Sequence, residues 1–386
     1  MRSSDRPDSP LRVLIVADRT GPRGGGVGVV VKNLCVEFPA VGVTPAVFSA
    51  TAEPDESESA AGVPVFRTRL GRPGLRPREI AGFARQLPAA RRAFRAAVRE
   101  FGPDVINVHF LNSGGAWLVA RRSNRGGTPV VASAHGRDVG EMADSLSGGR
   151  IARRVLRASA VATACSEALI ADVRRRAGNR PPVFRVVHNG VSIDAFANAR
   201  SLPRPAAAPY LLGVGELHPK KGFDLLLEAF REVGRERPDL YLLVPGEGVE
   251  RERLRRQAKD LGVGDRLVLP GHVRAADLPA YYAHAEAFAL SSRREPFGIV
   301  ALEAMAAGVP VVAARVGGVP EFVRDRANGL LVPPEDAAAL AGALRTVLAD
   351  RALAAGLVEE GRRTAERLTW RRTAEGYRDA CLEALR

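Results

Sequence analysis

Short runs of apolar residues alternate along the chain with longer stretches in which apolar side chains recur every three or four positions. The short runs predict strands over residues 11–17, 44–49, 104–109, 128–134, 159–165 and 183–188, and later over 210–215, 240–246, 265–271, 285–291, 309–314 and 329–334. The longer stretches predict helices, as where Phe223, Leu226, Leu227 and Phe230 fall at i, i+3, i+4 and i+7. This alternation is typical of parallel sheets covered by helices.

The series of strands is interrupted by a stretch rich in proline and small residues. Residues 198–210 read NARSLPRPAAAPY, so we expect a linker over residues 198–209. The linker would separate a first Rossmann-like domain, residues 1–197, from a second, residues 210–369. Open α/β domains bind their ligands at the carboxyl ends of the strands, which predicts a site in a cleft there.

Composition fits a soluble globular protein. The chain has 386 residues, 46% of them hydrophobic, which is enough for two ordinary domains. The longest early apolar run, residues 11–17, ends at Asp18 and is too short for a bilayer span or an export signal. The cysteines Cys35, Cys165 and Cys381 are far apart and form no metal-binding pattern. We therefore expect a cytoplasmic protein with no disulfide and no metal site.

The positive charge is concentrated in the first half of the chain. Of the net charge of +14, residues 1–200 carry +13, with 30 Lys and Arg against 17 Asp and Glu. Ten arginines and interleaved apolar residues between Arg67 and Arg99 predict an amphipathic basic segment on an anionic membrane surface, peripheral to the inner face, or on an acidic ligand. The alternative is a solvated helix in an arginine-rich chain. Nucleic acid is disfavoured because no zinc-finger spacing or stacking-aromatic pattern accompanies the charge.

Several familiar catalytic motifs are absent from the sequence. There is no GxxxxGK[ST] loop, no GxGxxG after the first strand, and no GxSxG, HExxH or DxD motif. The sequence therefore gives no support to a kinase, dehydrogenase, hydrolase or metalloprotease. A glycine-rich loop with Gly24, Gly25, Gly26 and Gly28 follows the first strand instead. It would let backbone approach a ligand before a helix begins, or would be a structural tight turn.

The strongest local signal is EPFGIVALE, residues 295–303. Pro296 is suited to the first helical position, which would leave the amides near residues 297–299 unpaired as a dipole-assisted site for a diphosphate. Glu295 and Glu303 would stand roughly 12 Å apart, at 1.5 Å per residue. That separation is too large for a cooperating acid–base pair and suits two anchors on an extended ligand. The alternative makes Glu295 a helix cap and Glu303 a solvated surface residue.

EPFGIVALE matches the E-x7-E signature of the family-4 retaining glycosyltransferases, and the chain resembles that family over most of its length. The segments that carry the resemblance occur in the family's order and are jointly specific: GGGVGVVVKNL, DVINVH, VVASAHGRD, ACSEALIADV, VVHNGVSIDAF, LLGVGELHPKKGFDLLLEAF, LVPGEG, LVLPGHV and VGGVPEFVRDRANGLLV. The resemblance implies the α/β fold called GT-B, two Rossmann-like parallel-sheet domains facing across a cleft. The first would lie on the acceptor side and the second would bind the nucleotide sugar. The Ala-rich end of the chain, punctuated by Gly361, predicts several helices, and the last, about residues 370–386, would pack back on the first domain.

The resemblance also implies roles for individual residues. Glu295 would contact hydroxyls of the donor sugar, Glu303 the ribose and Lys221 the diphosphate. His135, at the end of a first-domain strand, would reach the transferred sugar, or else would be a capped turn histidine. The backbone at Phe297, Gly298, Ile299 and Val300 would complete the phosphate cradle, and the backbone near His272 and Val273 would meet the base. The other donor-site candidates are Gly25, Gly26, Gly215 and Glu216.

One position departs from the family pattern. Glu216 stands where the family usually has an arginine that helps to neutralise the diphosphate. A carboxylate facing a diphosphate would be unfavourable by a few kcal/mol if the pair were partly desolvated. Either Glu216 turns away, or Lys220, Arg293 or Arg294 compensates, or the donor is unusual or the activity weakened.

The predicted function is a retaining, metal-independent glycosyl transfer from a nucleotide-sugar donor to an acceptor hydroxyl, without a cofactor. The acceptor stays open between a lipid-linked group, a saccharide and a small aglycone. Two alternatives are a nucleotide-sugar epimerase of the same architecture and a catalytically silent protein that binds a sugar nucleotide or a membrane surface. The helix expected within EPFGIVALE argues against the epimerase.

Overall fold

The computed structural model describes residues 9–17, 25–51, 62–71, 76–120, 127–144, 146–177 and 181–386. Gly24 of the glycine-rich loop and Arg72 of the basic segment lie outside these ranges. The chain divides into two compact units: the first is Met1–Asn189 with Trp370–Arg386, and the second is Gly190–Thr369. The second unit thus begins before the stretch expected to be a linker.

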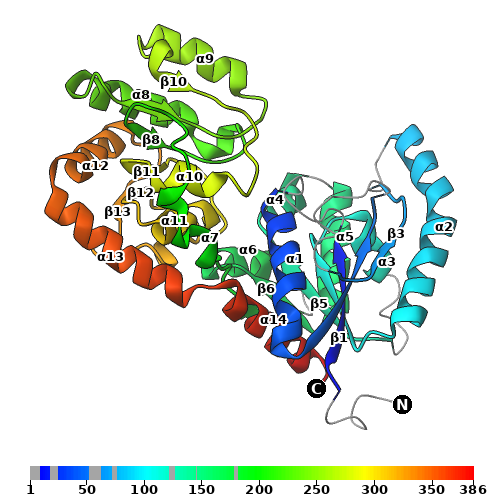
Figure 1. Cartoon of the computed structure of the whole chain (residues 1–386). Coiled ribbons are helices and arrows are strands. Elements are labelled where there is room, and N and C mark those ends of the chain that lie inside the picture. Colours follow the sequence, from blue (N-terminus) through cyan, green and yellow to red (C-terminus); the bar gives the residue numbers. More distant parts are fainter. Residues whose placement is uncertain are drawn as a thin grey trace. The chain divides into compact units, whose positions relative to one another are not determined.

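A parallel sheet forms the centre of the first unit (Figure 1). Its strand order among the described residues is β3-β2-β1-β4-β5-β6-β7. The strands are β1 (Leu11–Ala17), β2 (Val43–Ser49), β3 (Val65–Arg67), β4 (Val105–His109), β5 (Val130–Ala134), β6 (Val161–Ala164) and β7 (Val183–Val186). In β1, residues 13–17 are fully buried, as expected for a parallel strand covered on both faces.

Helices cover both faces of this sheet (Figure 1). They are α1 (Gly25–Glu37), the 3-10 helix η3 (Phe38–Val41), α2 (Pro77–Phe101), α3 (Gly114–Ala120), α4 (Arg137–Asp144), α5 (Leu146–Ala158), α6 (Glu167–Arg176) and, from the end of the chain, α14 (Trp370–Ala384). Helix α14 contacts β4, β5, β6, α1 and η3. It buries Trp370, Tyr377 and Cys381, and Thr373 donates a hydrogen bond to the carbonyl of His188 (2.9 Å).

The second unit repeats the plan with the strand order β10-β9-β8-β11-β12-β13, again parallel. Its strands are β8 (Tyr210–Leu212), β9 (Tyr241–Leu243), β10 (Leu267–Val268), β11 (Ala287–Leu290), β12 (Val311–Ala314) and β13 (Leu330–Val332). Its helices are α7 (Asp194–Ala197), η5 (Ala199–Ser201), η6 (Pro219–Lys221), α8 (Phe223–Glu236), α9 (Arg251–Asp260), η7 (Gly264–Arg266), α10 (Leu278–Ala283), α11 (Ile299–Ala307), η8 (Val319–Glu321), α12 (Ala337–Ala349) and α13 (Arg351–Arg367). The predicted apolar face of α8 is buried in the core.

Three expectations about local structure were wrong. The short strand β3 was missed. Helix α11 begins at Ile299, so Pro296 does not occupy its first position. Gly361 does not separate helices but lies inside α13, where a Cβ would stand 3.3 Å from Met305 of α11, so the glycine permits close helix packing. No helix in the described ranges has the length and apolar character that a bilayer crossing requires.

Candidate functional site

The second unit has its topological switch point between β8 and β11. These strands are paired in parallel, with Leu211 opposite Ala287, while the chain leaves β8 for β9 on the other side. The loops after β8 and β11 therefore start at the same edge of the sheet and diverge, which creates the crevice where open α/β sheets bind ligands. The loop after β8 carries Lys221 and the loop after β11 carries Glu295.

Lys221 and Glu295 form an ion pair at this edge. The Lys221 ammonium donates to Glu295 Oε2 at 2.6 Å, and the Ser292 hydroxyl donates to the same oxygen at 3.2 Å. The two charged side chains are only 16% and 9% exposed. Since an ammonium has three N–H donors and Glu295 takes one, Lys221 keeps donors for an anionic ligand.

The two loops are fitted together backbone to backbone. Ser291 Oγ donates to the carbonyl of Lys221 (3.1 Å), and the amide of Arg293 donates to the carbonyl of Lys220 (2.8 Å). Gly222 follows with φ +65°, and a Cβ there would overlap the carbonyl oxygen of Ser291. Only glycine combines this conformation with this approach, so Gly222 is needed to bring Lys221 to Glu295.

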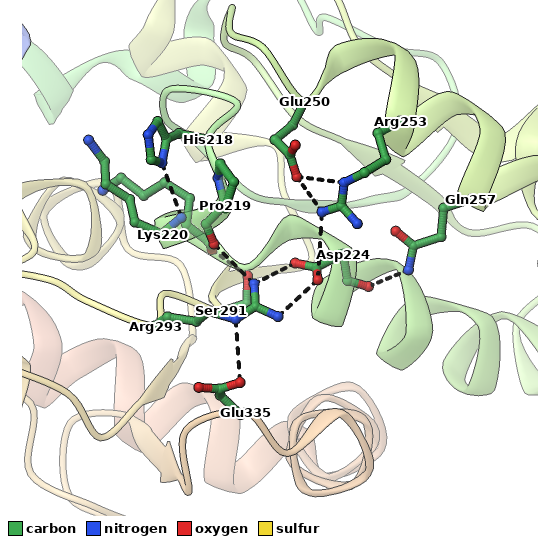
Figure 2. A network of polar contacts seen from close by, with 11 residues as sticks. His218, Pro219, Lys220, Asp224, Glu250, Arg253, Gln257, Ser291, Arg293 and Glu335 are labelled. Atoms are coloured by element: carbon green, nitrogen blue, oxygen red, sulfur yellow. Dashed lines mark hydrogen bonds and ion pairs between the residues drawn. The ribbon is translucent and has the colours of Figure 1, made fainter.

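Arg293 connects the same two loops through its side chain (Figure 2). Its guanidinium donates to both oxygens of Asp224 (2.7 and 2.9 Å) and to the carbonyl of Pro219 (3.0 Å). Burial alone would raise the pKa of Asp224, but the hydrogen bonds and charge of Arg293 outweigh it and lower that pKa. Arg253 bonds Glu250 and lies 3.7 Å from Asp224. Arg293 is therefore a structural clamp on the loop that carries Lys221.

The unusual carboxylate at position 216 pairs with a neighbouring lysine. Lys220 Nζ donates to Glu216 Oε2 at 2.9 Å, and the Glu216 side chain is 49% exposed. A half-exposed carboxylate with a cationic partner adds little repulsion toward an anion. Of the cations nominated from the sequence, Lys220 is the one that offsets Glu216, whereas Arg293 is engaged by Asp224 and the Arg294 side chain is exposed.

A cavity of about 540 Å³ adjoins these cations. It is lined by His218, Pro219, Lys220, Asp224, Glu250, Arg253, Arg293 and Arg294. Neither Lys221 nor Glu295 lines it. The nominated cations thus face a different space from the Lys221–Glu295 pair.

The amino end of α11 follows directly after Glu295. Gly298, with φ +105°, precedes the helix and lets the chain turn into it, while Phe297 is buried and stacks on Phe322 (ring centroids 4.9 Å apart). Ile299 and Val300 supply the first helical amides, which have no carbonyl one turn earlier to bond. The unpaired helical amides, expected near residues 297–299, are therefore those of Ile299 and Val300.

Glu303 is not a solvated surface residue. It lies one turn into α11, where Tyr282, a fully buried residue, donates its hydroxyl to Glu303 Oε2 at 2.7 Å. Burial raises the pKa of Glu303 from 4.5 to about 7, against a smaller opposing effect of the Tyr282 hydrogen bond. A carboxylate this close to neutrality can hold or release a proton under physiological conditions.

The remaining donor-site candidates occupy loops and helix starts. Gly215 follows β8 with φ +151°, and a Cβ there would stand 3.5 Å from Cε of Lys221. His272, which is exposed, and Val273 follow β10. Gly25 is the first residue of α1 and Gly26 the second, so the helix begins inside the glycine run and not after it.

In the first unit, His135 follows β5 and belongs to a chain of buried polar groups. Its Nε2 lies 2.9 Å from Nδ1 of His109, and Nε2 of His109 lies 2.7 Å from Oδ1 of Asn107. Burial lowers the pKa of both histidines, strongly for His109. Asn107 and His109 were not predicted as site residues, although two polar residues inside the apolar run DVINVH were a usable signal.

Asp138, at the start of α4, holds the loops around these histidines. One of its oxygens accepts the amides of His135 (3.0 Å), Gly136 (2.9 Å) and Val139 (3.1 Å), and the other accepts the amide of Leu111 (3.1 Å). Asp138 therefore joins the end of β4 to the end of β5 and fixes the backbone of His135.

Comparisons with known proteins agree with this architecture. The chain matches the family described as Glycosyltransferase Family 4 over residues 24–195 and the family described as Glycosyl transferases group 1 over residues 194–364. It is 33% identical to a D-inositol 3-phosphate glycosyltransferase of Acidothermus cellulolyticus, across 99% of this chain and 93% of the relative. It is 37% identical to a GDP-mannose-dependent alpha-(1-6)-phosphatidylinositol monomannoside mannosyltransferase of Mycolicibacterium smegmatis, across 66% of this chain and 69% of the relative.

Solved structures share the whole fold. Sucrose-phosphate synthase from Thermosynechococcus elongatus superposes with a TM-score of 0.79 at 27% identity, covering 96% of this chain and 98% of that one. HepE of Anabaena, in complex with UDP and glucose, superposes with a TM-score of 0.78 at 21% identity and the same coverage. With two parallel-sheet Rossmann-like units and full-length relatives of this kind, the chain belongs to the group 1 glycosyltransferases and is a glycosyltransferase of the GT-B fold.

Proposed function

We propose that the protein transfers a glycosyl group from a nucleotide-sugar donor to an acceptor hydroxyl, with retention of the anomeric configuration and without a metal ion. The observation that carries the proposal is the position of Lys221, beside Glu295 and the first turn of α11 at the switch point of the second sheet. A fixed ammonium contacts Glu295, and four residues further along the chain begins a helix whose first amides are unpaired. Both groups favour the oxygens of a diphosphate.

The carboxylates of the site divide the donor between them. Glu295 has one oxygen on Lys221 and Ser292, and its other oxygen is available to accept from hydroxyls of the donor sugar. Glu303, one turn along α11, would accept from the ribose. The name of the mycobacterial relative, which specifies GDP-mannose, supports a nucleotide sugar as the donor.

The transfer needs no nucleophile from the protein. The bond from the anomeric carbon to the phosphate oxygen breaks, the acceptor oxygen bonds that carbon from the same face, and the acceptor's proton passes to the leaving phosphate. The contribution of the protein is to hold Lys221 and the amides of α11 where negative charge grows on the phosphate. This division of labour also makes a metal ion unnecessary.

The central test follows nucleotide release from a panel of nucleotide sugars. We expect release that depends on the added acceptor, that persists in a chelator, and that yields a product with the donor's anomeric configuration by NMR. D-inositol 3-phosphate, which names several relatives, leads the acceptor panel. Isomerised donor without release would favour an epimerase, and neither product would favour a silent binding protein.

Thermal shifts identify the donor base before an acceptor is known. We expect one of UDP, GDP, ADP or dTDP to raise the melting temperature more than the others, because a ligand stabilises the native state by mass action. A nucleotide present at 100 times its Kd stabilises the native state by about 2.7 kcal/mol. A flat response to all four nucleotides would contradict the proposed donor site.

The surface of α2 supports a membrane partner for the first unit. Ile80, near the start of this helix, is 52% exposed. Six arginines along the helix are also exposed: Arg78, Arg85, Arg91, Arg92, Arg95 and Arg99. A row of exposed guanidinium groups favours an anionic lipid surface.

We therefore expect the protein to sediment with vesicles that contain anionic phosphatidylglycerol and not with phosphatidylcholine alone, and added salt should reverse the binding. The double variant R85Q/R92Q should weaken partitioning by about thirtyfold, at about 1 kcal/mol per removed charge. Arg351→Gln, on an exposed position of α13, is the matched control. Binding that ignores both lipid charge and salt would remove the membrane from the proposal.

A further inference from the structure

We infer that Asn107 and His109 are positioning residues that hold His135 in one tautomer, with hydrogen on Nε2 and with Nδ1 left to accept a hydrogen bond from a substrate hydroxyl. The inference rests on the proposed function, in which His135 reaches the transferred sugar. It goes beyond that function in assigning roles to two buried residues and a direction to one hydrogen bond.

The direction begins at Asn107. Its amide nitrogen lies 3.2 Å from the carbonyl oxygen of Val131 and 2.8 Å from Oγ of Ser133. A backbone carbonyl can only accept, so the nitrogen of the Asn107 amide must be on that side. The amide oxygen then faces His109, and because an amide oxygen can only accept, Nε2 of His109 must carry a hydrogen.

The second step passes through His109. This ring is fully buried at the end of β4, stacked on His135 with 5.0 Å between ring centroids and tilted against Tyr377 at 5.5 Å. Burial and the neighbouring His135 lower the pKa of His109 well below its usual value, so the ring is neutral. A neutral ring with hydrogen on Nε2 has a bare Nδ1, which must accept.

The last step fixes His135. The partner of the bare His109 Nδ1 is Nε2 of His135 at 2.9 Å, so this nitrogen must donate. Burial lowers the pKa of His135, against an opposing effect of Asp138, which leaves the second ring neutral as well. Its Nδ1 is then bare, and in the part of the chain that the structure describes no hydrogen bond is made to it. Asn107 thus determines, through His109, that Nδ1 of His135 accepts a hydrogen bond.

The charged and titratable groups around the two rings do not change the direction of these hydrogen bonds. Helix α4 presents Asp138, which binds the backbone of His135 and raises the pKa of the ring only in part. Helix α14 presents Tyr377 and Cys381, whose pKa values are raised by burial, so both stay neutral. The row of polar groups ends at uncharged hydroxyls beyond Asn107, since the Thr163 hydroxyl donates to Oγ of Ser133 at 2.9 Å.

The Asn107→Asp variant tests the inference through pH. A carboxylate in place of the amide stabilises the charged form of His109 and raises its pKa. Charged His109 donates from Nδ1, so His135 must accept at Nε2 and carry its hydrogen on Nδ1, where it can no longer accept from a substrate. We expect kcat at pH 7 to fall by about tenfold and to recover as the pH is raised through the new pKa of His109.

Ser159→Ala is the matched control, since it removes a buried hydroxyl that donates to the carbonyl of Val155 (2.8 Å) outside the chain of polar groups. It should leave both kcat and its pH profile unchanged. A loss in Asn107→Asp that is the same at every pH would mean a structural defect and would overturn the inference.

A second measurement observes the tautomers of the unmodified protein directly. Nitrogen NMR of protein labelled at its six histidines separates protonated from bare ring nitrogens, and the signals of His109 and His135 are assigned by replacing each in turn. We expect both rings to carry hydrogen on Nε2 alone at pH 7. Hydrogen on Nδ1 of His135 would overturn the inference. If the tautomers are as expected and His135→Ala keeps full activity, the proposed function of His135 fails instead.

Discussion

Replacing Lys221 with alanine should lower kcat by about 10²- to 10³-fold, the usual cost of removing one preorganised group that stabilises transition-state charge. Negative charge grows on the leaving phosphate as the glycosyl bond breaks, and Lys221 is the cation held beside Glu295 at the start of α11. Because this charge is larger in the transition state than in the bound donor, the effect should fall mainly on kcat and less on KM. Steady-state kinetics with the donor found in the thermal-shift panel measure both constants.

Two lysine variants make this result interpretable. Lys259→Ala removes an exposed lysine of α9 and should leave kcat unchanged. Lys221→Arg keeps the charge and the partner of Glu295, so it should recover part of the activity. Melting temperatures of all three variants are needed because Lys221→Ala leaves the buried Glu295 without its cation. Turnover near the unmodified rate in a folded Lys221→Ala protein would contradict the diphosphate assignment.

Replacing Glu303 with glutamine should stabilise the protein at pH 8 by up to about 3 kcal/mol, the free energy that corresponds to a pKa raised from 4.5 to about 7. Between these two pH values the folded state holds a proton that the unfolded state has lost, so stability falls as the pH rises and the full cost is present above pH 7. Glutamine carries no charge and still accepts from Tyr282, so it avoids this cost.

The pH dependence separates this explanation from a general packing effect. The gain in unfolding free energy for Glu303→Gln, measured with denaturant, should be present at pH 8 and absent at pH 4.5. Glu228→Gln, at an exposed position of α8, should give no gain at either pH. An equal gain at both pH values would contradict the ionisation argument. The same variant should reduce the stabilisation that the nucleotide provides, if the Glu303 carboxylate binds the ribose.

Much of the fold was predictable because parallel strands that are buried on both faces have continuous apolar runs in their sequence. Strand β1 was found at its true bounds, and the other long strands within a few residues. Strand β3 was missed because its three residues, Val65–Arg67, are too few to form a pattern. The strand pairs with β2 at the edge of the sheet. The proline rule failed at Pro296 because Gly298 makes the turn into α11 and sets the start of the helix three residues later than expected.

The site was predictable in its residues but not in its contacts. Lys221 and Glu295 were nominated from the family resemblance, yet they are 74 positions apart and meet only because β8 and β11 are neighbours. The partner of Glu216 could not be chosen from sequence because several cations lie nearby, and side-chain geometry selects Lys220. The burial of Glu303 depends on Tyr282 from another helix, which helix periodicity alone cannot indicate.

The order of synthesis gives α14 a further consequence. Helix α14 covers β4, β5 and β6 of the first unit, yet its residues leave the ribosome after those of the whole second unit. Domains generally fold as units with the amino-terminal one first during translation. Here the leading unit must wait, with part of its apolar surface uncovered, until the entire trailing unit has emerged. A ribosome that stalls after Thr369 would release a first unit without its closing helix, and that nascent chain would be a natural client for chaperones.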